Sequence, residues 1–170
     1  MSTSRPYHHG DLRAALLDAA LALLEGNETF SLRAVARRAG VSPTAPYRHY
    51  QDKEALLAAL ASYGFSKLAD RLAAATDLAG MAEEYVTFAL AHPGLFRLMY
   101  GRPTANAASA RTAEILASRV PDPAVQIGAW AMVHGLAVLL LDGKLPNSDP
   151  TQLVRATVAA VLTPPSRLSP

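Results

Sequence analysis

The chain has 170 residues, of which 51% are hydrophobic and 18% are charged, and this composition is typical of a packed globular protein rather than a disordered one. Valine and isoleucine are scarce beside alanine and leucine. This favours an all-α fold, because unbranched side chains keep most of their rotamer freedom in a helix. The chain has no cysteine, so disulfides, zinc–thiolate sites and cysteine nucleophiles are excluded.

The sequence has neither of the patterns expected for a secreted protein or a membrane protein. Its N-terminus, MSTSRPYHHGDL, lacks the apolar run of a signal peptide. The longest apolar stretch, AWAMVHGLAVLLL from Ala129 to Leu141, is too short to cross a bilayer. We therefore expect a cytoplasmic protein with no membrane partner.

Charge is distributed unevenly along the chain. Between Ser31 and Tyr50 there are four arginines and no acidic residue, whereas from Leu68 onward eight basic residues balance eight acidic ones. A local basic patch suits a polyanion, but a solvated helix face explains the same pattern equally well. Charge alone leaves both interpretations open.

Two helices are expected before residue 41. Apolar residues at helical spacing predict the first over 11–25. The segment TFSLRAVARRAG predicts a second helix of about two turns, with Ser31 as its N-cap and Gly40 as the left-handed residue after its end.

The segment VSPTAPYRHY, 41–50, is expected to start a third helix at once. Ser42 is its predicted N-cap, and Pro43 fits the first helical position, where a backbone N–H has no partner in any case. Pro46 removes the N–H that would bond to the Ser42 carbonyl, so it strains a full α-helix. Two short helices joined by a glycine turn form a helix-turn-helix, whose second helix can lie in a DNA major groove.

The two faces of this third helix differ in character. Thr44, Tyr47 and Arg48 share one face, which we expect to be exposed and able to reach DNA. Tyr50 lies on the opposite face and is expected in the core. Ser42 and Thr44 also stand at the N-terminal end of the helix, where free N–H groups can hold a phosphate.

The rest of the chain predicts a long helix over 52–75 with Asp52 as its N-cap, and five further helices at about 79–91, 94–100, 105–119, 123–141 and 150–162. About nine helices are therefore expected in all. We expect two domains and a tail: a DNA-binding domain at 1–53, a helical domain at 54–165 and a tail at 166–170.

Two parts of the sequence carry a family resemblance. The segment FSLRAVARRAGVSPTAPYRHYQDKEALLAAL, 30–60, resembles the helix-turn-helix of the TetR family of transcriptional regulators. The family pattern has a hydroxyl residue at the start of the second helix, a glycine–valine turn, a tyrosine followed by x-His-aromatic, and a lysine at the start of the fourth helix. The stretches EYVTFALAHPGLFRLMYG, 84–101, and WAMVHG, 130–135, resemble a subgroup named for a tryptophan, a histidine and a glycine.

This resemblance implies a homodimeric regulator, usually a repressor, that binds a palindromic operator in double-stranded DNA and is released by a small-molecule effector. It also assigns roles to residues. Positions near base edges correspond to Pro43, Thr44 and Ala45, and positions that contact the DNA backbone correspond to Ser31, Arg33, Tyr47, His49 and Lys53. Pro46 departs from the wider family, in which leucine is usual.

Candidates for an effector cavity come from the second half of the chain. Aromatic residues and methionine at helical spacing could line it, although core packing explains the same spacing; these candidates are Tyr85, Phe88, Phe96, Met99, Trp130 and His134. His134 has no histidine or carboxylate one helical turn away, so we expect no metal site and no cofactor.

The two C-terminal helices, over 123–141 and 150–162, are expected to form the homodimer interface as a four-helix bundle. Their apolar faces include Ala129, Val133, Ala137, Val154, Val158 and Val161.

An enzyme is not expected, because the chain contains no dinucleotide-binding glycine loop, P-loop, nucleophile elbow or HExxH helix. The alternative to a DNA-binding regulator is a helical adaptor that binds only protein. The acid-free basic stretch favours the regulator, since an adaptor has no use for it.

Overall fold

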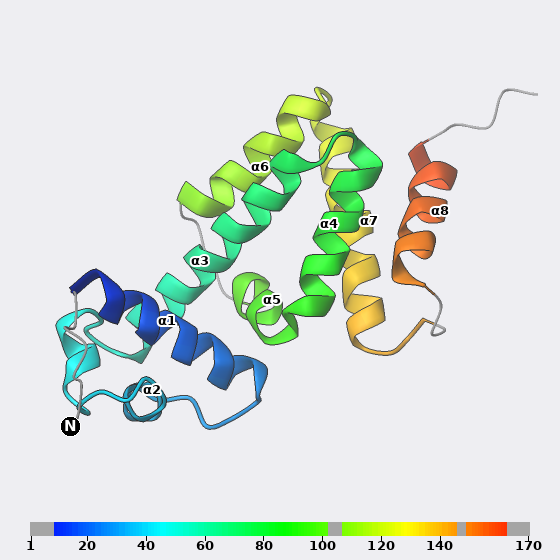
Figure 1. Cartoon of the computed structure of the whole chain (residues 1–170). Coiled ribbons are helices and arrows are strands. Elements are labelled where there is room, and N and C mark those ends of the chain that lie inside the picture. The colour runs from blue at the N-terminus through cyan, green and yellow to red at the C-terminus, as the bar shows by residue number, and fades with distance from the viewer. Residues whose placement is uncertain (1–8, 102–106, 146–148, 163–170) are drawn as a thin grey trace, which may run out of the picture.

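The computed structural model describes residues 9–101, 107–145 and 149–162, and in these ranges the chain is helical with no strand (Figure 1). Its elements are α1 (His9–Glu25), α2 (Leu32–Arg38), the 3₁₀ helix η1 (Ala45–Arg48), α3 (Lys53–Ala74), α4 (Leu78–Ala91), α5 (Pro93–Tyr100), α6 (Ala107–Arg119), α7 (Pro123–Leu141) and α8 (Pro150–Leu162). The all-α prediction is confirmed, and the expectation of about nine helices is close to the eight α-helices and one 3₁₀ helix found.

Side-chain caps fix where several helices begin. The hydroxyl oxygen of Ser31 accepts a hydrogen bond from the N–H of Ala34 at 3.1 Å, and the Asp52 carboxylate accepts one from Ala55 at 2.7 Å. Both caps were predicted from sequence. Gly40 follows α2 with a φ of +69°, a left-handed conformation that favours glycine. The turn after α2 is therefore built as the sequence indicates.

The predicted third helix is wrong in its start and in its type. Residues 42–44 form a turn rather than the first turn of a helix, so Ser42 is not an N-cap and Pro43 is not its first residue. The N–H of Ala45 bonds to the Ser42 carbonyl three residues back at 3.0 Å, and only four residues, Ala45–Arg48, are helical. The cause is Pro46, because it has no N–H to give to that carbonyl in an α-helical bond.

The helix α3 joins the two ends of the molecule (Figure 1). It begins beside α1, where Leu56 and Leu60 belong to the buried core, and runs on to α4, α5 and α6, where Phe65, Leu68 and Leu72 are buried. The core is continuous from α1 to α8. The same helix therefore contributes side chains to the core beside α1 and to the core beside α4, α5 and α6.

The helices α7 and α8 both pack on α4. The faces that we expected to form a dimer interface are instead turned inward: Ala129, Val133, Ala137, Val154 and Val158 are buried within the chain, and of the six residues named only Val161 is exposed. That part of the prediction is wrong, because the faces that carry these five residues are covered within the chain, where both helices pack on α4. The exposed side of α7 still carries large apolar side chains, among them Ile127 and Trp130.

By length and composition, α7 is the one helix among the described residues that could cross a membrane, with a mean hydropathy of 1.8 over its most apolar window. The helix begins at Pro123, six residues before the apolar run 129–141, so the expectation that this segment is too short to cross a bilayer is wrong by length. Only 17% of that window is buried within the chain. The helix α7 is therefore apolar and largely uncovered by the rest of the described chain.

Candidate nucleic-acid interface and effector cavity

The turn and η1 present a cluster of exposed polar side chains at one end of the molecule. Thr44, Tyr47 and Arg48 are all exposed, and 53% of Tyr47 is accessible to solvent. Pro46 is buried between them, and Tyr50 is buried with 3% exposed. The alternation of inward and outward residues holds Tyr47 out of the core, so its ring and hydroxyl are free to meet a partner surface.

Other candidate DNA-binding residues surround η1 in differing environments. Ser31 is part-buried and engaged as the cap of α2, whereas Arg33 is exposed on that helix. Lys53 begins α3 with its ammonium 5.8 Å from the centre of the Phe30 ring. A long cation at a helix start, steadied by an aromatic face, is well placed to reach a phosphate.

The remaining candidate residues of the segment 42–49 also differ in exposure. Ser42, Pro43 and Thr44 are exposed, and the hydroxyl oxygens of Ser42 and Thr44 lie 3.2 Å apart, within hydrogen-bonding distance. Ala45 is partly buried and packs on the core, and His49 is half-buried. Ala45 therefore supports the turn more than it faces outward.

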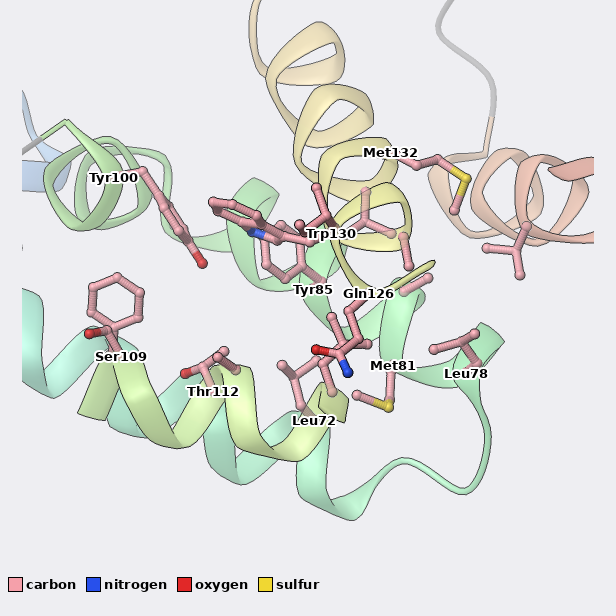
Figure 2. A pocket seen from close by; sticks show the side chains of 18 of the residues that line it. Leu72, Leu78, Met81, Tyr85, Tyr100, Ser109, Thr112, Gln126, Trp130 and Met132 are labelled. Carbon is pink, nitrogen blue, oxygen red and sulfur yellow. The ribbon is translucent and has the colours of Figure 1, made fainter. Parts of the chain in front are cut away.

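A cavity of about 410 Å³ lies in the other half of the molecule, lined by α3, α4, α5, α6 and α7 and by Val158 of α8 (Figure 2). Apolar residues make up most of its wall. The side chains that line it are Phe65, Leu72, Leu78, Met81, Ala82, Tyr85, Met99, Tyr100, Ser109, Thr112, Ala113, Leu116, Gln126, Ile127, Ala129, Trp130, Met132, Val133 and Val158. Its volume is in the range of small-molecule sites, roughly 300–1,000 Å³.

A polar cluster stands at one end of this cavity. The hydroxyl of Tyr85, from α4, lies 2.9 Å from Nδ1 of His134 on α7, and Nε1 of Trp130 donates a hydrogen bond to the same hydroxyl at 3.4 Å. The rings of Tyr85 and Tyr100 lie 6.2 Å apart. Burial raises the pKa of both tyrosine hydroxyls and lowers the pKa of His134, so all three groups are uncharged at neutral pH.

Comparison with known proteins identifies both halves of the chain. Residues 16–60 match the family described as bacterial regulatory proteins, tetR family, and residues 78–161 match the tetracyclin repressor-like, C-terminal domain. A structure of a protein of unknown function from Rhodococcus sp. RHA1 is 36% identical, with a TM-score of 0.78, and the alignment covers 91% of this chain and 95% of that one. This chain belongs to the TetR family. It is a DNA-binding transcriptional regulator.

Other solved TetR-family structures agree with this assignment. A TetR-family transcriptional regulator from Streptomyces coelicolor is 28% identical, with a TM-score of 0.64 over 88% of this chain and 96% of that one. A TetR family transcription regulator from Marinobacter aquaeolei VT8 shares the fold at 21% identity, with a TM-score of 0.61 over 85% and 90% of the two chains. No curated protein matches the sequence. Regulators of this family are in general non-enzymatic.

In this TetR-family regulator, three of the six residues expected at the cavity line its wall: Tyr85, Met99 and Trp130. His134 and Phe96 stand one layer behind, with their rings stacked 5.4 Å apart. His134 lies behind Tyr85, to which it is hydrogen-bonded, and its ring is 4.8 Å from that of Tyr100. Phe88 lies elsewhere, buried beside His92 with the Arg71 guanidinium 5.7 Å from its ring centre. The expectation that Phe88, Phe96 and His134 line the cavity is therefore wrong. Phe96 and His134 pack behind Tyr85 and Tyr100, and the side of α4 that carries Phe88 faces the core.

Sequence reasoning missed other lining residues that share a helix face with the ones it found. Gln126 precedes Trp130 by four residues and lines the cavity beside it. Tyr100 directly follows Met99 at the end of α5. No sequence feature marks the lining residues of α6, because side chains such as Thr112 and Leu116 occur at the same spacing in any amphipathic helix. Among the described residues, no group of three or more His, Asp or Glu side chains is placed to hold a metal ion.

Proposed function

We propose that this regulator is a repressor that binds a palindromic operator as a homodimer and leaves it when a small molecule enters the cavity. The observation that carries the proposal is that α3 starts beside the exposed cluster of η1 and ends as a wall of the cavity. One rigid helix thus belongs to both sites, and a ligand that favours one position of α3 selects one position of the DNA-binding end.

The DNA contacts are proposed for the exposed side chains around η1. Thr44 stands at the start of the segment and can reach a base edge, while Tyr47 and Arg48 can contact bases or phosphates. Lys53 and Arg33 are proposed as phosphate contacts. The short 3₁₀ helix offers few side chains to the groove, so we expect phosphate contacts to supply much of the affinity.

The homodimer is proposed to form through the exposed faces of α7 and α8. On α7 this face carries Gly128, Ala131 and Gly135, and a methyl group added at either glycine would meet no atom within 4 Å. On α8 it carries Ala156 and Ala160, both exposed. Small side chains allow two helices to approach closely, and a two-fold partner would cover the apolar surface that one chain leaves open.

A DNA-selection experiment tests this proposal. Genomic fragments bound by the purified full-length protein would be sequenced, and the affinity for the recovered site would be measured against random duplex DNA over a range of salt concentrations. We expect a palindromic site, a dimer's mass in the complex and an affinity that falls steeply with salt. Equal, salt-independent binding to all duplexes, or no binding, would favour the adaptor alternative.

A further inference from the structure

The cavity wall contains no charged side chain among the described residues. The cations around it are engaged outside: Arg111 on α6 pairs with Asp70 at 2.8 Å, and Arg119 donates hydrogen bonds to the carbonyls of Thr76 and Ala75 at 3.0 and 3.2 Å. A carboxylate or an ammonium group that entered the cavity would lose its water without gaining a counter-charge. Charged ligands are therefore disfavoured at this wall.

The polar groups of the wall are themselves neutral and gather at one end. Figure 2 shows Tyr85, Tyr100 and Trp130 together, with the Tyr100 hydroxyl pointing into the space beside Trp130. The Tyr85 hydroxyl is held by His134 and Trp130. Because burial raises the pKa of both tyrosines, they present hydroxyl groups rather than phenolates. A hydroxyl can donate to or accept from one oxygen of a ligand.

The remainder of the wall is apolar and adaptable. Met81, Met99 and Met132 all line the cavity, and these are the only methionines in the sequence after Met1. Methionine side chains are flexible and polarisable, and they make favourable contacts with aromatic rings. Leu72 and Leu78 add aliphatic surface on the side away from Tyr100 (Figure 2). This part of the cavity suits an apolar body of variable shape.

We propose that the effector is an uncharged, mainly apolar molecule with one hydroxyl or carbonyl oxygen, which hydrogen-bonds at the Tyr85–Tyr100–Trp130 end while the apolar body lies among the methionines. This inference rests on the proposed function in one respect, namely that the cavity is the effector site. It adds the chemical class of the ligand, which follows from the uncharged wall and from the placement of its hydroxyl groups.

A series of matched probes tests the ligand class. Trp130 is the only tryptophan in the chain, so its fluorescence reports binding at the cavity wall. The probes are phenylbutanol and methyl phenylbutanoate, which are neutral, and phenylbutanoate and phenylbutylamine, which are charged at neutral pH. We expect both neutral probes to change the fluorescence saturably and both charged probes to bind at least about tenfold more weakly. Equal or tighter binding by a charged probe, or no binding by either neutral one, overturns the proposal.

The polar contact is tested by removing one hydroxyl group. Tyr85→Phe should weaken the binding of phenylbutanol roughly three- to tenfold and leave butylbenzene, which has no oxygen, unchanged in calorimetry. Tyr100→Phe gives the same comparison if Tyr85→Phe does not fold. Tyr50→Phe is the matched control, because Tyr50 is a buried tyrosine that does not line the cavity. Its hydroxyl has no hydrogen-bond partner in the part of the chain that the structure describes. If Tyr85→Phe weakened the binding of phenylbutanol and of butylbenzene equally, the Tyr85 hydroxyl would not be a ligand contact, and this part of the proposal would be overturned.

Failure of this inference can be distinguished from failure of the proposed function. Operator affinity is measured with and without each probe in the same buffer. If neutral probes bind but leave operator affinity unchanged, the ligand class stands and the release mechanism fails. If only the charged probes release DNA, the release mechanism stands and the ligand class is wrong.

Discussion

The carboxylate of Glu25, the last residue of α1, caps the start of α5 at Gly94. Its two oxygens accept hydrogen bonds from the backbone N–H groups of Gly94 and Leu95, at 2.8 and 3.0 Å. A methyl group added at Gly94 would lie 2.8 Å from the Leu24 carbonyl oxygen, so glycine permits this close approach. At its other end α5 carries Met99 and Tyr100 in the cavity wall. A second connection therefore links the cavity to the DNA-binding end, beside α3.

Replacement of this carboxylate tests the connection. Glu25→Gln keeps the shape but removes the charge that interacts with the positive end of α5, and its amide has one acceptor oxygen, so only one of the two N–H groups keeps its hydrogen bond. We expect the free energy of unfolding in urea to fall by about 1–2 kcal/mol. We also expect an effector to release less operator from the variant than from the parent protein.

The control for this prediction is Glu28→Gln. Glu28 forms an ion pair with Arg38 at 2.9 Å, and both side chains are nearly half exposed, so its loss should change stability by less than about 0.5 kcal/mol. If the two variants are equally stable and equally responsive to effector, Glu25 does not couple the two ends of the molecule.

The residues around η1 separate into those expected to read bases and those expected to hold phosphates. Thr44→Ala should cost roughly 1–3 kcal/mol on the preferred site only, because Thr44 is exposed where it can face a base edge. Lys53→Ala should weaken binding to all sequences alike and flatten the slope of log affinity against log salt by about one unit. Fluorescence anisotropy on operator and random duplexes measures both effects.

The control for the pair is Lys67→Ala. Lys67 is exposed farther along α3, with its ammonium 5.4 Å from the centre of the Tyr63 ring, and its loss should leave both quantities unchanged. If Thr44→Ala weakened both duplexes equally while Lys53→Ala altered base preference, our assignment of the two contacts would be reversed.

Much of the fold could be predicted because its signals are local. Ser31 and Asp52 each precede a helix and cap it through a side chain three residues away from its bonded N–H, a relationship visible in the sequence. Tyr47 and Tyr50 were placed outside and inside the core by their spacing, and the structure agrees. The boundaries of α7 and α8 coincide with the expected ranges, since a proline starts each helix.

The errors arise where two local signals compete or where the answer depends on distant contacts. Ser42 and Pro43 are typical of a helix start, but Pro46 cannot donate to the Ser42 carbonyl, and a 3₁₀ helix that begins at Ala45 results. Both sides of α7 are apolar, so its pattern could not tell which side meets α4. Phe88 and Tyr100 look equally suited to a cavity, and only the packing of α5 and α6 against α3 distinguishes them.

The proposed dimer interface is tested by a charge on its α7 face. Ala131→Arg puts a cation on the exposed side of the helix, beside Gly128 and Gly135, where a close helix partner would have to bury it. We expect the protein to become monomeric at micromolar concentration in sedimentation analysis and to lose at least about tenfold in operator affinity. Thr87→Arg, at an exposed position of α4, is the control and should remain dimeric. A dimeric Ala131→Arg variant would place the interface elsewhere.

His134 predicts a pH dependence of stability. Burial lowers its pKa in the folded protein below the ordinary value of 6.5, so between these two values the unfolded chain binds a proton that the folded chain does not. Above pH 6.5 the imidazole is uncharged in both states, so His134 does not change the free energy of unfolding. Below pH 6.5 the free energy of unfolding falls as the pH drops. His134→Asn should remove this part of the pH dependence, because an amide oxygen can still accept a hydrogen bond from the Tyr85 hydroxyl but does not titrate.

Urea denaturation of both proteins between pH 5 and 8 measures this pH dependence, and the difference between the two profiles isolates His134 from the carboxylates that titrate at lower pH. We expect the two curves to run parallel above about pH 7 and the parent to lose stability faster below about pH 6. Curves that stay parallel down to pH 5, or a parent that gains stability in acid relative to the variant, would show that His134 is not held neutral by its burial.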